Sequence, residues 1–232
     1  MPLIQKILRR GLLHSIEIVF NRIVPAWVFR FSTGCVFELD PKKLDEVLSG
    51  IDNSNYVLTC VEQGSAARDQ LRKLTWNSVP IETSYNDFGY SIANVSSPTD
   101  VLGGVWGAIE SFQEADLGFQ LQFEASQAWI YCAYVNKEAQ GQGVYKRVLA
   151  FGTDDLITKG YERILVVIQP WNRASMYVHG KYAKKRLGTI TAIRIFSFIA
   201  VFTTGDVKKD RTITLSPLRN PVQLRISNPI QT

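Results

Sequence analysis

The sequence is poor in the residues that build disulfide-stapled or metal-centred proteins. Its 232 residues include only three cysteines and two histidines. Cys35, Cys60 and Cys132 lie far apart, and the chain has neither a CxxC pair nor a Cys/His cluster. This pattern argues against a disulfide framework and against a zinc site. We expect three buried, inert thiols in a protein of the reducing cytoplasm, and no metal.

Long uninterrupted apolar runs are also lacking. Charged residues interrupt the N-terminal segment at Lys6, Arg9, Arg10, Glu17 and Arg22, so we expect neither a secretory signal nor a membrane-spanning helix there. The most apolar stretch, "ITAIRIFSFIAVFTT", contains an arginine and is rich in β-branched and aromatic residues. It predicts a buried strand or hairpin rather than a membrane helix.

The charge balance is modest. Charged residues make up 20% of the chain and hydrophobic residues 46%, which predicts a globular core rather than disorder. A formal net charge of +5 and a pI near 9.1 favour anionic partners such as nucleotides, phosphates or membrane surfaces. No basic run is interleaved with aromatic residues, and no repeat or low-complexity tract occurs, so we expect no nucleic-acid partner.

The first fifty residues predict an N-terminal extension. Residues 3–22 carry a broad apolar stripe typical of a helix that packs on its own domain, with peripheral membrane contact as the alternative. Within residues 26–40, apolar residues alternate with other residues on both sides of Ser32-Thr33-Gly34, which predicts a hairpin. A short helix follows, capped by Asp40, opened by Pro41 and closed by Gly50.

The middle of the chain alternates between strand and helix patterns. Residues 54–63 predict a strand, and 65–76 a helix. Residues 77–100 are rich in Ser, Asn, Pro and Asp and predict mostly a loop, which we expect to face the substrate. "VLGGVWGAIESF", "LGFQLQFE" and "AWIYCAYV" predict three strands of an antiparallel meander. The polar tail 206–232 predicts an extended arm.

A glycine-bearing loop occupies the crossover of a βαβ unit. The order is strand (129–135), loop (139–143), helix (144–159) and strand (163–168). Unpaired N–H groups and the positive end of the dipole make a helix N-terminus an anion site. Gly141 and Gly143 remove side chains from this point, and Lys146 and Arg147 add positive charge. From spacing alone, a plain turn and a phosphate cradle remain equally open.

Two common phosphate motifs do not fit, but a third does. The chain lacks GxxxxGK[ST], and no third glycine completes GxGxxG. "QGQGVY" resembles the acyl-CoA loop of the GNAT acyltransferase superfamily, [Q/R]-x-x-G-x-[G/A]. Gln140 and Gly143 match this pattern, whereas Tyr145 departs from its small last residue.

The following helix extends the resemblance. "NRASMYVHGKYAKKRLG" is similar to the superfamily's N-x-x-[A/S] segment with its later Tyr and K-L-G-F. Asn172, Ser175 and Lys181 match, and His179 stands in the place of the usual Tyr. Ala183 and Lys184 replace the Gly-Phe pair, which is the clearest departure.

The resemblance covers roughly residues 100–200 and implies an α/β (α+β) fold. That fold has a mixed, mostly antiparallel central sheet with a splayed parallel strand pair and flanking helices. Residues 51–205 would form the acyltransferase domain, with 1–50 as the N-terminal helix and hairpin extension and 206–232 as the C-terminal arm.

The same resemblance implies a co-substrate, acetyl-CoA or another acyl-CoA, and an amine acceptor that it does not specify. The residues it assigns to acyl-CoA binding are Ala133, Tyr134, Val135, Gln140, Gly141, Gln142, Gly143, Val144, Tyr145, Lys146, Asn172 and Ser175. His179 would donate a proton to the departing thiolate, because imidazole can donate near neutral pH, with Tyr177 in reserve. Glu124, Glu110 and Glu138 are the candidate general bases, with bulk water as the alternative.

Other functions remain open at this stage. The lost Gly-Phe pair favours a catalytically degenerate relative that binds acyl-CoA or another protein. Binding of nucleic acid or a membrane surface ranks last, because the positive charge is modest.

Overall fold

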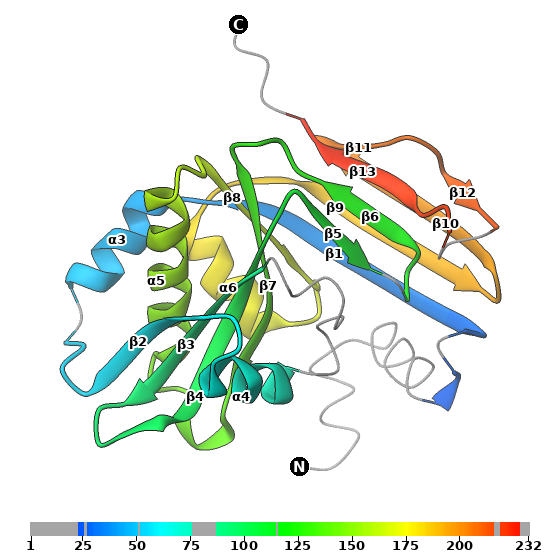
Figure 1. Cartoon of the computed structure of the whole chain (residues 1–232). Helices are drawn as coiled ribbons and strands as arrows, with labels where there is room; N and C mark the ends of the chain where they lie inside the picture. Colours follow the sequence, from blue (N-terminus) through cyan, green and yellow to red (C-terminus); the bar gives the residue numbers. More distant parts are fainter. Residues whose placement is uncertain are drawn as a thin grey trace, which may run out of the picture.

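Two β-sheets and four helices make up the described part of the chain (Figure 1). The computed structural model describes residues 23–25, 27–50, 52–75, 87–114, 116–215 and 219–227. The main sheet has nine strands in the order β12-β10-β9-β1-β8-β7-β4-β3-β2, and the second has four in the order β11-β13-β6-β5. The helix predicted over 3–22 lies outside the described residues.

The elements have the following bounds. The helices are α3 (Pro41–Ser49), α4 (Ala66–Thr75), α5 (Val144–Thr158) and α6 (Arg173–Tyr182), with a short 3₁₀ turn at Lys137–Ala139. The strands of the main sheet are β1 (Phe29–Leu39), β2 (Tyr56–Val61), β3 (Phe88–Asn94), β4 (Ser97–Ile109), β7 (Gln127–Val135), β8 (Arg163–Ile168), β9 (Ala183–Ile195), β10 (Phe198–Gly205) and β12 (Ile213–Thr214). The second sheet contains β5 (Ser111–Glu114), β6 (Phe119–Gln122), β11 (Val207–Lys209) and β13 (Val222–Ile226).

The fold class agrees with the prediction. Neighbouring strands of the main sheet are antiparallel except for β7 and β8, which pair in parallel. Helix α5 connects these two strands, as the βαβ pattern predicted. The hairpin β9–β10 accounts for the most apolar stretch of the sequence.

The predicted N-terminal hairpin is wrong. Residues 29–39 form one long strand, β1, which lies between β8 and β9 near the centre of the main sheet. Thr33 pairs with Thr191, and their hydroxyl oxygens lie 3.1 Å apart, so Ser32-Thr33-Gly34 continues the strand. Gly34 has a packing role instead of a turn role, because a Cβ there would collide with the side chain of Val167.

The predicted C-terminal arm is also wrong, at least where it is described. Three strands form there, and β13 pairs in parallel with β6 of the second sheet. Val222, Leu224 and Ile226 alternate along β13 and are buried. The sequence shows this alternation of apolar residues. The strand that pairs with β13, however, lies about a hundred residues upstream, and local sequence patterns do not identify it.

The predicted loop over 77–100 needs a similar correction. Residues 76–86 lie outside the described part of the chain, but β3 and the beginning of β4 occupy most of the remainder. Tyr90 and Ile92 are completely buried in β3. Tertiary packing therefore overrides the polar, turn-rich composition of this segment.

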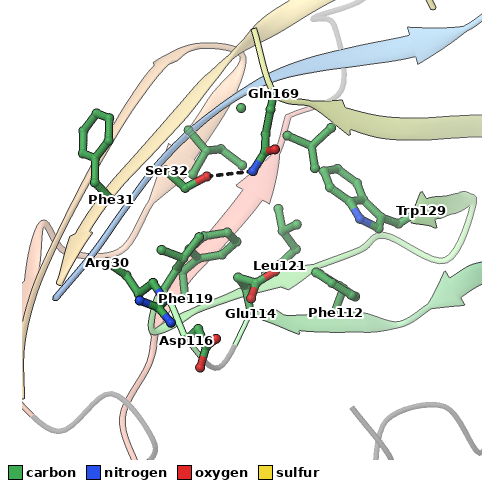
Figure 2. Close-up of a pocket in the computed structure, with 14 residues that line it drawn as sticks. Arg30, Phe31, Ser32, Phe112, Glu114, Asp116, Phe119, Leu121, Trp129 and Gln169 are labelled. Atoms are coloured by element: carbon green, nitrogen blue, oxygen red, sulfur yellow. Dashed lines mark hydrogen bonds between the residues drawn. The ribbon is translucent and has the colours of Figure 1, made fainter. Parts of the chain in front are cut away.

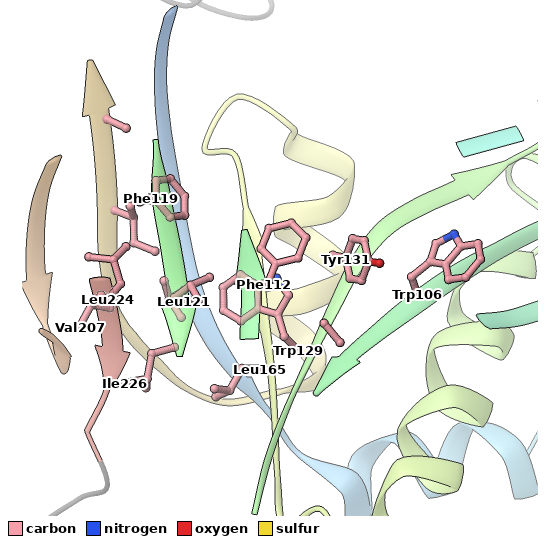
Figure 3. Close-up of a cluster of buried hydrophobic side chains, with 14 of the residues drawn as sticks. Trp106, Phe112, Phe119, Leu121, Trp129, Tyr131, Leu165, Val207, Leu224 and Ile226 are labelled. Atoms are coloured by element: carbon pink, nitrogen blue, oxygen red, sulfur yellow. The ribbon is translucent and has the colours of Figure 1, made fainter. Parts of the chain in front are cut away.

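The two faces of the main sheet carry different cores. Helices α3, α5 and α6 lie on one face, where the core is mainly aliphatic. On the other face lie α4 and the second sheet, and aromatic rings fill the space between (Figure 3). Phe112 packs on Tyr131 with ring centroids 4.7 Å apart and stacks on Trp129 at 6.3 Å. None of the described helices has the length and hydropathy needed to cross a membrane.

A buried ion cluster fixes β1 to its neighbours. Arg163 donates from Nε and Nη2 to one carboxylate oxygen of Glu38, at 3.1 and 2.9 Å, and Lys184 Nζ lies 3.1 Å from the other. Burial alone raises the pKa of Glu38, but hydrogen bonds and charges from Arg163 and Lys184 outweigh it, so the net pKa lies below its usual value. Lys184, which replaces an aromatic residue of the motif, thus has a structural partner.

Replacement of Glu38 by Gln tests this cluster. The change leaves the guanidinium of Arg163 without its counter-charge, so the free energy of unfolding at neutral pH should fall by about 3 kcal/mol in urea denaturation. The stability difference between wild type and variant should shrink as the pH falls below the ordinary glutamate pKa of 4.5. Below that pH the unfolded wild type binds a proton at Glu38 while the folded wild type resists protonation, so the wild type loses stability and approaches the variant. Lys184→Met is the control: this side chain is 63% exposed, so its loss should cost at most about 1 kcal/mol. An equal loss in both variants would contradict the assignment.

Candidate active site

The central feature of the site is the point where two parallel strands separate. Strands β7 and β8 pair from Gln127–Arg163 to Ile130–Val166, and the pairing ends there. β7 continues to Val135, while β8 continues to Ile168 against β1. Beyond Ile130, β7 therefore has a strand partner on one side only within the described residues, and a gap begins beside it.

A β-bulge lies on β7 inside this gap. Tyr131 pairs with Trp106 and Tyr134 with Gly104, so β7 contains one residue more than β4 over this interval. Cys132 takes up the extra residue with a φ of 50°, which is unusual for a residue other than glycine. A bulge turns backbone groups away from the ladder and is frequent next to active sites. Ala133, Tyr134 and Val135, which the resemblance assigns to acyl-CoA binding, follow this bulge.

The glycine loop lies at the same end of the sheet and opens helix α5. Gly141 and Gly143 both have left-handed φ values, 81° and 75°. Gly143 is the N-cap of α5 and provides no side-chain cap, so no side chain of this residue covers the first N–H groups of the helix. A Cβ at Gly141 would meet nothing within 4 Å, so the backbone there is open to a ligand. The geometry is that of an anion cradle.

The two basic residues after the loop have different roles. Arg147 is buried and donates to Asn53 Oδ1 at 3.0 Å, to the Asp52 carbonyl at 3.2 Å and to the Gln142 carbonyl at 2.9 Å. It therefore holds the loop in place. Lys146 is only partly buried and, among the described residues, makes no recorded ion pair or hydrogen bond through its ammonium group. Lys146 is thus the available positive charge beside the cradle.

A hydrogen bond joins the first turn of α5 to α6. Tyr145 Oη lies 2.8 Å from His179 Nε2, and His179 Nδ1 lies 2.8 Å from the carbonyl oxygen of Ser175. A carbonyl only accepts, so the imidazole proton is on Nδ1 and Tyr145 donates to Nε2. Burial lowers the pKa of His179 to about 4, partly opposed by the bond to Ser175, and raises that of Tyr145 well above its usual value.

This arrangement argues against His179 as the proton donor. The side chain is fully buried, it is neutral at physiological pH, and its single N–H proton is directed at a backbone carbonyl. The motif placed the residue correctly on α6 but could not supply its hydrogen-bond partners. Tyr177, the reserve donor, is 75% exposed on the same helix and points to solvent.

The remaining predicted residues divide between the site and its support. Asn172 caps α6 by accepting from the backbone N–H of Ser175 at 3.2 Å, which is a structural role. Glu124 precedes β7 at the closed end of the β7–β8 pair, and the strand from Gln127 to Cys132 spans roughly 16 Å at about 3.3 Å per residue, so Glu124 is not placed to act as a base at the bulge. Glu110 and Glu138 are exposed.

A hydrogen-bonded pair that the sequence analysis missed, Asp87 and Tyr131, lies on the face of the sheet opposite α5. The hydroxyl of Tyr131, the residue before the bulge, donates a short hydrogen bond to Asp87. Both side chains are buried, and burial raises the pKa of Asp87 to about 6 although Tyr131 and Arg68 oppose it. Asp87 stood in a segment that predicted a loop, and only its place directly before a buried Phe-Gly-Tyr hinted at burial. No group of metal-binding side chains occurs in the described ranges.

Comparisons with known proteins show the family of the chain and its shared fold. A sequence model of the acetyltransferase (GNAT) family matches residues 68–189, just over half of the chain. An N-acetyltransferase related to GCN5 from Kribbella flavida shares the fold with a TM-score of 0.50 at 11% identity, over 79% of this chain and 63% of that one. No curated protein matches the sequence.

Two further solved structures match at lower structural similarity. An aminoglycoside acetyltransferase from an uncultured soil metagenomic sample, in complex with trehalose, has 14% identity over 56% of this chain and 88% of that one, with a TM-score of 0.43. Glucosamine-6-phosphate N-acetyltransferase from Arabidopsis thaliana has 14% identity over 56% and 93%, with a TM-score of 0.38.

The protonation state of His179 can be tested by NMR. The chain has two histidines, so a His14→Gln variant leaves one imidazole, whose ¹⁵N shifts report its tautomer and its pKa. We expect the proton on Nδ1 and titration near pH 4, as long as the fold persists. Tyr145→Phe removes a donor to the neutral ring and should raise this pKa. Titration near the ordinary value of about 6.5 would show that His179 is not buried as described.

Proposed function

The chain belongs to the GNAT family of acetyltransferases, and on that premise we propose that it transfers an acyl group from an acyl-CoA, in the first instance acetyl-CoA, to an amine. The observation that carries the proposal is the separation of β7 from β8 after Ile130, with the glycine loop of α5 at the same end of the sheet. A gap beside an anion cradle suits a long thioester that carries a pyrophosphate.

The residues present fit this co-substrate. The backbone N–H groups of Gly141, Gly143, Val144 and Tyr145 would hold the pyrophosphate, whereas that of Gln142 already donates to the Ala139 carbonyl. Lys146 would add the charge that balances the pyrophosphate. The backbone after the bulge at Cys132 would pair with the pantetheine arm. Acyl-CoA supplies an activated thioester carbon, which the amine attacks directly.

The reaction also requires two proton transfers. The amine nitrogen bonds to the thioester carbon, the carbon–sulfur bond breaks, the amine loses a proton and the thiolate gains one. Asp87 has a pKa near 6 and is hydrogen-bonded to Tyr131, next to the bulge, so this pair is suited to accept the amine proton at neutral pH. A backbone N–H at the bulge would polarise the carbonyl oxygen.

A second function is favoured by one observation. Tyr145 replaces the small residue of the family motif and is bonded to His179, so neither side chain offers a free proton beside the gap. This arrangement favours a degenerate relative that binds acyl-CoA, or a protein partner, without transferring the acyl group.

Replacing a glycine of the loop tests acyl-CoA binding. Gly143→Val forces a β-branched residue to φ 75°, and its Cβ would lie 2.6 Å from Lys146 Cε and 2.8 Å from Arg147 Nη1. We expect calorimetry to show CoA affinity reduced at least about a hundredfold, because the change removes most of a cluster of charge-assisted hydrogen bonds. Gly160→Val is the control, since Gly160 also has a left-handed φ, 95°, but lies in open space past the far end of α5. Unchanged affinity in the Gly143 variant would refute the cradle.

Turnover on a panel of amines separates the two functions. With acetyl-CoA saturating, release of free CoA thiol would support the enzyme, while CoA binding without release on any amine would support the degenerate relative. If the chain is an enzyme, Asp87→Asn should lower kcat by roughly 10²-fold or more, because general base catalysis contributes that much. Asp45→Asn, an exposed carboxylate on α3, should leave kcat unchanged.

A further inference from the structure

A cavity lies between the main sheet and the second sheet (Figure 2). Its volume is about 270 Å³, which is small for a ligand site and suits a molecule with few heavy atoms. The walls come from β1, the β5–β6 hairpin, β7, β8 and β9. Trp129 belongs to β7, and Val167 and Gln169 lie on β8 and directly after it, so both strands beside the gap contribute to this cavity.

The walls are largely apolar. Phe31, Phe112, Phe119 and Trp129 contribute aromatic rings, and Leu121 and Ile190 contribute aliphatic groups. Phe112 stacks on Trp129 and also packs on Tyr131, so the same aromatic layer continues toward the bulge. Flat rings in a mainly apolar cavity favour an aromatic or alkyl body.

One carboxyl group at this cavity lacks a counter-charge. Among the described residues, no recorded hydrogen bond or ion pair reaches the side chain of Glu114. The Glu114 side chain is half-buried, and desolvation by the surrounding protein, followed by the like charge of Asp116, raises its pKa to about 7. Arg30 also lines the cavity, but it donates to the carbonyls of Val24 at 2.8 Å and Phe29 at 3.1 Å. Arg194 donates to the carbonyls of Phe196 and Asp116.

A second polar group in the wall also lacks a partner. Trp129 is 1% exposed, and its indole N–H has no hydrogen-bond partner among the described residues. Buried polar groups are normally satisfied, so an unpaired donor and an unpaired acid around one cavity are unusual for a site that is only structural. Of the two, only the carboxyl group can bind a cation, because an ammonium group has no acceptor to offer the indole N–H.

We propose that this cavity binds a small amine with an aromatic or alkyl body, as the ammonium ion, with Glu114 as its anchor. If that amine is the acyl acceptor, an assignment that rests on the proposed function, its nitrogen must leave Glu114 and lose a proton before it attacks the thioester, because an ammonium nitrogen has no lone pair. A cation supplies the missing counter-charge of Glu114, and an apolar body fills the aromatic walls. A polyhydroxylated amino sugar fits less well, because most of the wall is apolar and burying hydroxyl groups against aromatic rings costs free energy.

Calorimetry with the full chain and 2-phenylethylamine as the probe tests the cavity. We expect binding near pH 8, and binding weakened at least about tenfold in Glu114→Gln, which keeps the shape and removes the charge. Glu62→Gln makes the same chemical change at an exposed site and should have no effect. The neutral isostere 2-phenylethanol should bind at least about tenfold more weakly than the amine, and glucosamine should not bind.

The wild-type chain gives an independent reading through pH. Ammonium binding requires ionised Glu114, so affinity should fall on the order of tenfold or more from about pH 8 to pH 5.5. The other charged side chains that line the cavity are Arg30 and Asp116. Equal affinity for the amine and the alcohol would overturn the proposal. So would an amine affinity that changes neither with pH nor in the Glu114→Gln variant.

CoA titrations of the same proteins separate this inference from the proposed function. Glu114→Gln should bind CoA as the wild type does, because the carboxyl lies on the opposite face of the sheet from α5. If CoA binds and the amine does not, the cavity assignment fails and the acyltransferase proposal stands. If the amine binds through Glu114 and CoA does not, the cavity stands and the acyltransferase proposal fails.

Discussion

The end of the hydrogen-bond ladder between β7 and β8 is the constraint on which the rest of the site depends. After Ile130 and Val166 the two strands no longer pair, so backbone inside the sheet becomes accessible. The bulge at Cys132 turns that backbone, and the chain leaving β7 leads directly into the glycine loop and α5. If the ladder continued by a few residues, the gap would close and the loop would be a plain turn.

β1 stabilises this separation from the outer side. An unpaired β8 would be free to close onto β7, but β1 pairs with it from Leu165 to Ile168 and anchors it through Glu38 and Arg163. The strand also pairs with β9 along most of its length. A segment that the sequence placed outside the catalytic domain is therefore part of the scaffold that keeps the gap open.

The sequence predicted local features and misread those whose causes are remote. The capping residues predicted α3 correctly, because a cap acts within one turn of the helix. The order of strand, glycine loop, helix and strand predicted the crossover between β7 and β8. Gly34 looked like a turn because its true neighbour, Val167, lies far along the chain. The motif located His179, but its proton and its low pKa depend on partners and burial that the whole fold supplies. Likewise, nothing beside Glu114 in the sequence shows that the packing of two sheets would bury it. A sequence motif can assign the position of a functional residue, whereas the protonation state of its side chain depends on contacts made in the folded structure.

The two proposed ligands suit one electrostatic arrangement. On the α5 side, helix N–H groups and Lys146 present positive charge without a side-chain cap. On the other side of the sheet, Glu114 and Asp87 are carboxyls whose pKa burial raises toward neutrality. An anionic thioester and a cationic amine would thus approach from opposite faces and meet where the sheet is open. Because the main sheet separates the two regions, the positive charge of Lys146 and the negative charge of Glu114 do not cancel each other, and each proposed ligand carries a charge opposite to that of the group that would bind it.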